Sequence, residues 1–98
     1  MRTIWAYDIP YNRVDNLLLD LPRTAKAISV AGVVEDTVSV WFEIPDSTLP
    51  LERRKFVILP TGSSIPNSYA YIGTVHESTR AIHLYESFSL TPEELYTQ

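Results

Sequence analysis

Apolar and polar positions alternate along most of this chain. The cleanest run is the segment 37–44, where Val38, Val40, Phe42 and Ile44 fall on one face. A repeat of two is the period of a β-strand with one buried face. Similar runs, bounded by Pro, Gly, Asn, Asp and Ser, predict seven strands at 3–9, 17–21, 27–34, 37–44, 55–59, 69–76 and 81–88.

Short polar breaks between neighbouring runs predict three hairpins, over 3–21, 27–44 and 69–88. In the last one, a turn at 78–79 sets Val75 opposite Ile82, Gly73 opposite Leu84 and Tyr71 opposite Glu86.

The register of the middle hairpin is open by one residue. Val33, Ala31, Ser29 and Ala27 are expected opposite the apolar face of 37–44. Its centre at 35–36 lacks glycine, so either a longer loop or a bulge at Gly32 fits the pattern.

The end of the chain carries a helix signal. Thr91 is a suitable N-cap, Pro92 suits the first helical position, and Leu90 and Leu95 can form a hydrophobic staple. We therefore expect a β domain at 1–89 and a helical tail at 90–98. The fold class is mainly β: a single small antiparallel β-sandwich or partly open barrel of about seven strands, with a short C-terminal helix.

Composition narrows the classes of partner. The chain has 98 residues, 45% of them hydrophobic and 20% charged, with a net charge of −4, as expected for one globular domain. The basic cluster Arg53-Arg54-Lys55 is interpreted as a solvated strand entrance, so no nucleic-acid partner is expected. Without cysteine there is no disulfide and no thiolate site, and no apolar run is long enough to suggest a membrane span. Cytoplasm is the expected location.

The two histidines are the strongest candidates for a metal site. The predicted hairpin places His76 and His83 diagonally, about 6–8 Å apart at their β-carbons. A bound metal needs a third ligand, and Glu77 and Glu86 point to the opposite face. We interpret both histidines as scaffold, keep a metal site as the minority hypothesis, and expect no cofactor.

A second candidate is the loop of Thr61, Gly62, Ser63 and Ser64, whose N–H groups and hydroxyls could hold an anion. It lacks the lysine and the following helix of a phosphate-binding loop, so a simple turn is favoured. No nucleophile elbow or converging carboxylate pair occurs in the sequence, and we expect no enzymatic activity.

Trp41 faces away from Phe42 and contributes to a second apolar surface beside Ile28 and Val30. We expect a second sheet, the C-terminal tail or a partner to cover that surface, because a single sheet cannot bury both of its faces.

Several short motifs recur in an order that resembles a known family. They are Ile4-Trp5-x-Tyr7, Leu21-Pro22-x-x-Ala25-Lys26-x-Ile28-Ser29-Val30, Thr61-Gly62-x-x-Ile65-Pro66, Tyr71-Ile72-Gly73-Thr74 and Ile82-His83-Leu84-Tyr85-Glu86. The chain is similar over residues 3–86 to small phage and prophage β-rich proteins of unassigned function. The family often has histidine where this chain has Ser63, and the segment after Phe88 looks like an addition.

The resemblance implies a phage origin and action in the host cytoplasm or on the particle. The first hypothesis is a non-catalytic protein that binds a host or phage protein, for example an inhibitor of a host defence or metabolic enzyme. The alternative is a structural component of the virion, and the third is a ligand- or metal-binding domain using His76 and His83. Candidate contacts are an exposed edge strand, which could also pair with a second copy, the loop residues Thr61, Gly62, Ser63 and Ser64, and the tail residues Leu90, Leu95 and Tyr96.

Overall fold

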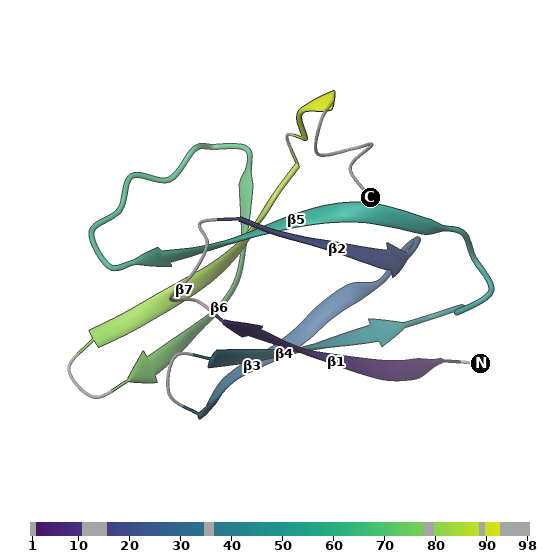
Figure 1. Ribbon diagram of the computed structural model, residues 1–98, viewed down its shortest axis with the longest axis horizontal. Coiled ribbons are helices and arrows are strands. Elements are labelled where there is room, and N and C mark those ends of the chain that lie inside the picture. Colours follow the sequence, from purple (N-terminus) through teal and green to yellow (C-terminus); the bar gives the residue numbers. More distant parts are fainter. Residues whose placement is uncertain (1, 11–15, 35–36, 78–79, 89, 93–98) are drawn as a thin grey trace.

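The computed structural model describes residues 2–10, 16–34, 37–77, 80–88 and 90–92. Within them the chain forms seven strands, and all of the pairings are antiparallel (Figure 1). They are β1 (Thr3–Pro10), β2 (Asn16–Pro22), β3 (Lys26–Val34), β4 (Thr37–Ile44), β5 (Leu51–Pro60), β6 (Tyr69–Glu77) and β7 (Arg80–Ser87). The mainly β class is confirmed.

The strands form two sheets. One contains three strands in the order β1-β4-β3, and the other contains four in the order β2-β5-β7-β6. The predicted hairpins over 27–44 and 69–88 are confirmed, as β3–β4 and β6–β7.

The predicted hairpin over 3–21 is wrong, because β1 pairs with β4 and β2 pairs with β5. The observed pairing joins matching apolar faces: Tyr7 lies beside Val40 and Ile9 beside Val38 in one sheet, while Leu17 lies beside Phe56 in the other. The sequence between β1 and β2 also lacks the Asn-Gly or Asp-Gly pair that favours a tight hairpin.

The main core forms where side chains from both sheets meet. Its buried members come from β1, β4, β2, β5 and β7 and from the turn after β2: Ile9, Leu21, Ala25, Val40, Phe42, Ile44, Phe56 and Leu84. Phe42 contacts the ring of Tyr7 edge-on at 5.8 Å and that of Phe56 at 5.5 Å. The Phe42–Phe56 contact joins the two sheets and adds to the burial of apolar area, whereas the Tyr7–Phe42 contact lies within the three-stranded sheet.

Two glycines allow β3 and β6 to approach closely. A β-carbon at Gly32 would lie 2.8 Å from Val75 Cγ1, and one at Gly73 would overlap the side chain of Val30. The absence of a side chain at both positions therefore sets how near the two sheets come on this side.

Each of these glycines adjoins a register shift. The shift between Gly32 and Val34 confirms the bulge considered at Gly32, and with a second shift between Ala27 and Ser29 it corrects the predicted register. Val38 lies opposite Gly32 instead of Val33, and Val40 lies opposite Val30 instead of Ala31.

A similar shift changes the β6–β7 pairing. Val75 pairs with Ile82 and Gly73 with Leu84, as predicted. Tyr71 pairs with Tyr85 instead of Glu86, because the shift between Tyr71 and Gly73 inserts one residue.

Trp41 lies on the outer face of the three-stranded sheet, between Ala6 on β1 and Ser29 on β3. It is half-buried, whereas Ile4 and Ile28 on the flanking strands are 60% and 47% exposed. The other sheet packs on the opposite face, so it does not cover this apolar surface.

At the C-terminus, Leu90 is half-buried and Thr91 and Pro92 are exposed. The predicted helical tail from residue 93 onward, with Leu95 and Tyr96, lies outside the described residues. Among the residues that are described, no helix has the length and apolar character needed to cross a membrane.

Candidate functional site

A chain of hydrogen bonds links β6, β7 and the loop after β5. Tyr71 Oη lies 2.5 Å from Thr74 Oγ1, and Thr74 Oγ1 lies 2.9 Å from His83 Nδ1. On the other side of the ring, Thr61 Oγ1 lies 2.9 Å from His83 Nε2 and donates to the carbonyl of Ala81 at 3.3 Å. We call Tyr71, Thr74, His83 and Thr61 the His83 network.

Strand register brings these side chains together. Thr74 pairs with His83 across β6 and β7, and Leu59 pairs with His83 across β5 and β7. Thr61 lies two residues after Leu59, at the start of a turn. The Ser63 N–H closes this turn by donating to the Pro60 carbonyl at 3.2 Å. Gly62 in this turn has φ +97°, a conformation that L-residues with a β-carbon rarely adopt.

For a neutral His83 ring, a donation from Thr61 to the Ala81 carbonyl leads to the following set of donors. Since the Thr61 hydroxyl donates to Ala81, its oxygen accepts from His83 Nε2–H. His83 Nδ1 then accepts from the Thr74 hydroxyl, whose oxygen accepts from Tyr71. Each threonine hydroxyl donates once and accepts once, which favours the Nε2–H tautomer of His83.

This arrangement bears directly on the metal hypothesis. Both ring nitrogens of His83 are engaged by hydroxyl groups, so a metal ion would have to displace one of them. His76 is exposed on β6. Within the described ranges, no three His, Cys, Asp or Glu side chains are placed to share a metal ion.

The network supports an exposed aromatic surface. The Tyr71 ring is fixed at its hydroxyl end and is still 59% exposed, and it packs edge-on against Tyr85 with ring centroids 5.4 Å apart. The loop 61–68 begins at Thr61 and is exposed throughout except for half-buried Ser63. We call the surface formed by Thr61, Tyr71, Thr74, His83 and Tyr85 the Tyr71 face.

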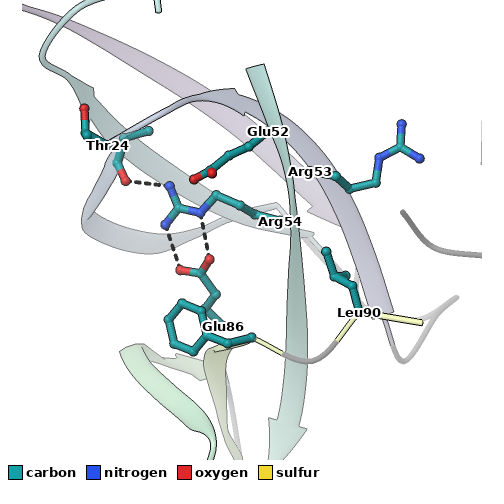
Figure 2. Close-up of a pocket in the computed structure, with 8 residues that line it drawn as sticks. Thr24, Glu52, Arg53, Arg54, Glu86 and Leu90 are labelled. Carbon is teal, nitrogen blue, oxygen red and sulfur yellow. Dashed lines mark hydrogen bonds and ion pairs between the residues drawn. The ribbon is translucent and has the colours of Figure 1, made fainter. Parts of the chain in front are cut away.

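A pocket of about 290 Å³ lies beside β5 and the end of β7 (Figure 2). Its lining residues are Thr24, Ala25, Glu52, Arg53, Arg54, Glu86, Phe88 and Leu90.

A buried ion pair forms the polar wall of this pocket. Arg54 Nε and Nη2 donate to the two carboxylate oxygens of Glu86, each at 2.7 Å, and Nη1 donates to the Ala25 carbonyl at 2.5 Å (Figure 2). The side chains of Arg54 and Glu86 are only 14% and 8% exposed. Arg54 also stacks over the ring of Phe56, 5.8 Å from its centroid.

The interpretation of the whole basic cluster as a solvated strand entrance is therefore wrong for Arg54. Consecutive residues of a strand point to opposite faces, so Arg54 shares the inner face with Phe56 while Arg53 faces outward. Arg53 pairs with Asp20 through bonds of 3.0 and 3.1 Å. The hydrogen bond from Arg53 lowers the pKa of Asp20, against a smaller opposing effect of burial. The signal that could have revealed Arg54 was its two-residue spacing from Phe56.

The predicted site residues separate into two places. Thr61 meets His83 in the network, Gly62 and half-buried Ser63 form the adjacent turn, and Ser64 is exposed in the loop. Leu90 instead lines the pocket, which contains the inner-face side chain of Glu86.

Two antiparallel sheets, a histidine held by two hydroxyl groups and an exposed tyrosine characterise the described part of a small, mainly β domain. The chain belongs to the family DUF7352, described as a domain of unknown function, whose model matches residues 1–94. The match extends beyond Phe88, to residue 94. No curated protein and no solved structure matches the chain.

Proposed function

We propose that this chain is a small non-catalytic phage protein that binds a host protein in the cytoplasm and thereby inhibits a host defence or metabolic enzyme. The Tyr71 face is the binding surface. The observation that carries the proposal is Tyr71, a residue that is 59% exposed although its hydroxyl lies 2.5 Å from Thr74 Oγ1.

Preorganisation is the physical basis for choosing this surface. A side chain already held in one conformation loses little entropy on binding, so more of its contact energy appears as affinity. Tyrosine is also enriched at binding hot spots, because its ring buries apolar area while its hydroxyl keeps a polar partner. The exposed loop 61–68, joined to the network by Thr61, extends this surface.

The geometry around His83 supports binding over catalysis. A general base needs a ring nitrogen that can accept a proton from a substrate. Nδ1 and Nε2 of His83 are both engaged within the domain, by Thr74 and Thr61. The ring therefore acts as a brace between β6, β7 and the loop.

The phage assignment rests on the resemblance of the sequence motifs to phage proteins. The family match is consistent with a small family of unassigned function and adds no activity.

The test is affinity capture from infected cells with the tagged wild-type chain and two single variants. Tyr71→Ala should lose a stoichiometric host protein that the wild type retains. Phe88→Ala is the matched control, because Phe88 is a similarly exposed aromatic residue, at 66%, located at the pocket. If Phe88→Ala loses the partner and Tyr71→Ala keeps it, the pocket and tail form the binding surface and the Tyr71 face does not.

The same preparation separates the other hypotheses. Recovery of the chain in purified particles, with no host protein bound, would indicate a virion component. For the third hypothesis, metal analysis of the purified protein applies. Stoichiometric metal that is lost in His76→Ala and His83→Ala would replace the protein-binding proposal with a metal-binding one.

A further inference from the structure

The outer edge of β1 is a long, regular strand edge. In the part of the chain that the structure describes, β1 is hydrogen-bonded to β4 alone, at one end of the three-stranded sheet. Its eight residues pair with β4 in unbroken register from Thr3 to Pro10. The edge strands β3 and β6, by contrast, contain register shifts and approach each other at Gly32 and Gly73. The remaining edge strand of the described sheets, β2, pairs with β5 without a register shift and is one residue shorter than β1. Backbone groups on a regular edge are a template for another strand.

We propose that a second copy of this chain occupies this edge. Two β1 strands pair antiparallel about a two-fold axis at Trp5 and join the two three-stranded sheets into one of six strands. A two-fold contact uses the same patch on both subunits, so the strand must be complementary to its own reverse.

The register follows from the two faces of β1. Tyr7 and Ile9 point into the core with Trp5, so outward residues must meet outward residues across the new pair. This restricts the two-fold centre to a residue position, because a centre between residues would set a core residue opposite an outward one.

Three residues near the middle of β1 can lie on the two-fold axis: Trp5, Ala6 and Tyr7. The charges that each register brings together distinguish among them. Centred on Trp5, the pairing sets Arg2 opposite the partner's Asp8 twice, and Ile4 opposite the partner's Ala6 twice. Centred on Ala6, it would set Ile4 opposite the partner's Asp8. Centred on Tyr7, it would leave Arg2 beyond the paired segment. Only the first register joins opposite charges and joins apolar to apolar side chains.

The surroundings of both charges suit this contact. The Arg2 side chain is 73% exposed and makes a single 3.4 Å contact with Glu43. Asp8 is exposed, and a hydrogen bond of 2.5 Å that it accepts from the Ser39 hydroxyl orients its carboxylate. The new sheet would also bring together the two copies of the apolar surface around Trp41, including exposed Ile4.

The experiment is a measurement of the oligomeric state of the full chain across a concentration series, by sedimentation and light scattering. We expect a monomer–dimer equilibrium. Asp8→Arg places two arginines opposite each other at both ends of the contact and should weaken dimerisation by about tenfold or more. The double variant Arg2→Asp/Asp8→Arg restores opposite charges and should recover the wild-type dissociation constant to within about threefold.

The swap also controls for folding, because Asp8→Arg and the double variant lose the same bond from Ser39. Arg23→Glu is the control for a change in overall charge: Arg23 is exposed in the turn between β2 and β3, outside the three-stranded sheet. A monomer at every concentration, a dimer insensitive to Asp8→Arg, or a double variant that fails to recover would each overturn the proposal. The Tyr71 face lies on the other sheet, so either proposal can fail without the other.

Discussion

The Arg54–Glu86 pair should contribute far more to stability than the neighbouring Arg53–Asp20 pair. Both are two-bond arginine–carboxylate contacts made by consecutive residues of β5. They differ mainly in burial: Arg54 and Glu86 are 14% and 8% exposed, whereas Arg53 and Asp20 are 20% and 46% exposed.

Glu86→Gln keeps the shape of the side chain and removes its charge. The guanidinium of Arg54 then stays buried without a counter-charge. The amide NH₂ of the new side chain also faces an N–H group of Arg54, so two donors meet. Removal of one partner of a buried ion pair costs about 3–5 kcal/mol. This is a large share of the roughly 5–15 kcal/mol that stabilises a typical domain. For a chain of this size, the melting temperature should fall by at least about 12 °C.

The assay is urea-induced unfolding followed by the fluorescence of Trp5 and Trp41, with the free energy of unfolding obtained from the midpoint and slope. Asp20→Asn is the matched control and should cost only about 0.2–1 kcal/mol, because solvent screens the exposed pair. A Glu86→Gln cost below about 1 kcal/mol, or one equal to that of Asp20→Asn, would refute the argument from burial.

A double variant separates charge from packing. Replacing both partners, as Arg54→Met/Glu86→Leu, removes the uncompensated charge and should restore most of the stability lost in Glu86→Gln. If the double variant is as unstable as Glu86→Gln, the instability of the double variant comes from altered packing and from the lost bond between Arg54 Nη1 and the Ala25 carbonyl.

Two further predictions concern packing and pH. Gly73→Ala should lower the free energy of unfolding by about 1–3 kcal/mol in urea, because the added β-carbon overlaps the stiff side chain of Val30. Adding Val30→Ala to the same chain should recover part of that loss. If the costs of the two changes are additive, the overlap is not the cause. In the folded chain the pKa of Asp20 is lowered, first of all by its hydrogen bond from Arg53. The stabilisation of the folded state by the Asp20 carboxylate is therefore present above the unfolded pKa of about 3.9 and is lost as the pH falls through the folded pKa. The stability difference between wild type and Asp20→Asn should therefore shrink as the pH drops below about 4, and a difference that grows would contradict the assigned sign.

The sequence by itself determined that there are seven strands, although β5 begins at Leu51, four residues before its predicted start at Lys55. A period of two is a local property, and Val38, Val40, Phe42 and Ile44, chosen from that period alone, are all buried. It also determined the two hairpins whose strands are separated by a short polar break, and the opposition of Val75 and Ile82 within one of them.

Tertiary structure decided which strands lie side by side when they are distant in sequence. The missing Asn-Gly or Asp-Gly pair does not by itself exclude a β1–β2 hairpin, because the sequence of the observed β3–β4 hairpin lacks one as well. The pairing of β1 with β4 depends on matching apolar faces across many residues. The close approach of β3 to Gly73, beside the register shift in β6, likewise exists only in the folded molecule.

The candidate sites depend on the same long-range choices. Thr61 reaches His83, and Arg54 reaches Glu86, because β5 lies beside β7. The sequence supplied each of these side chains and the face on which it lies. The contacts between them depend on the pairing of β5 with β7, which lie about twenty or more residues apart in sequence. At that separation, no local sequence pattern indicates which strand will be the neighbour.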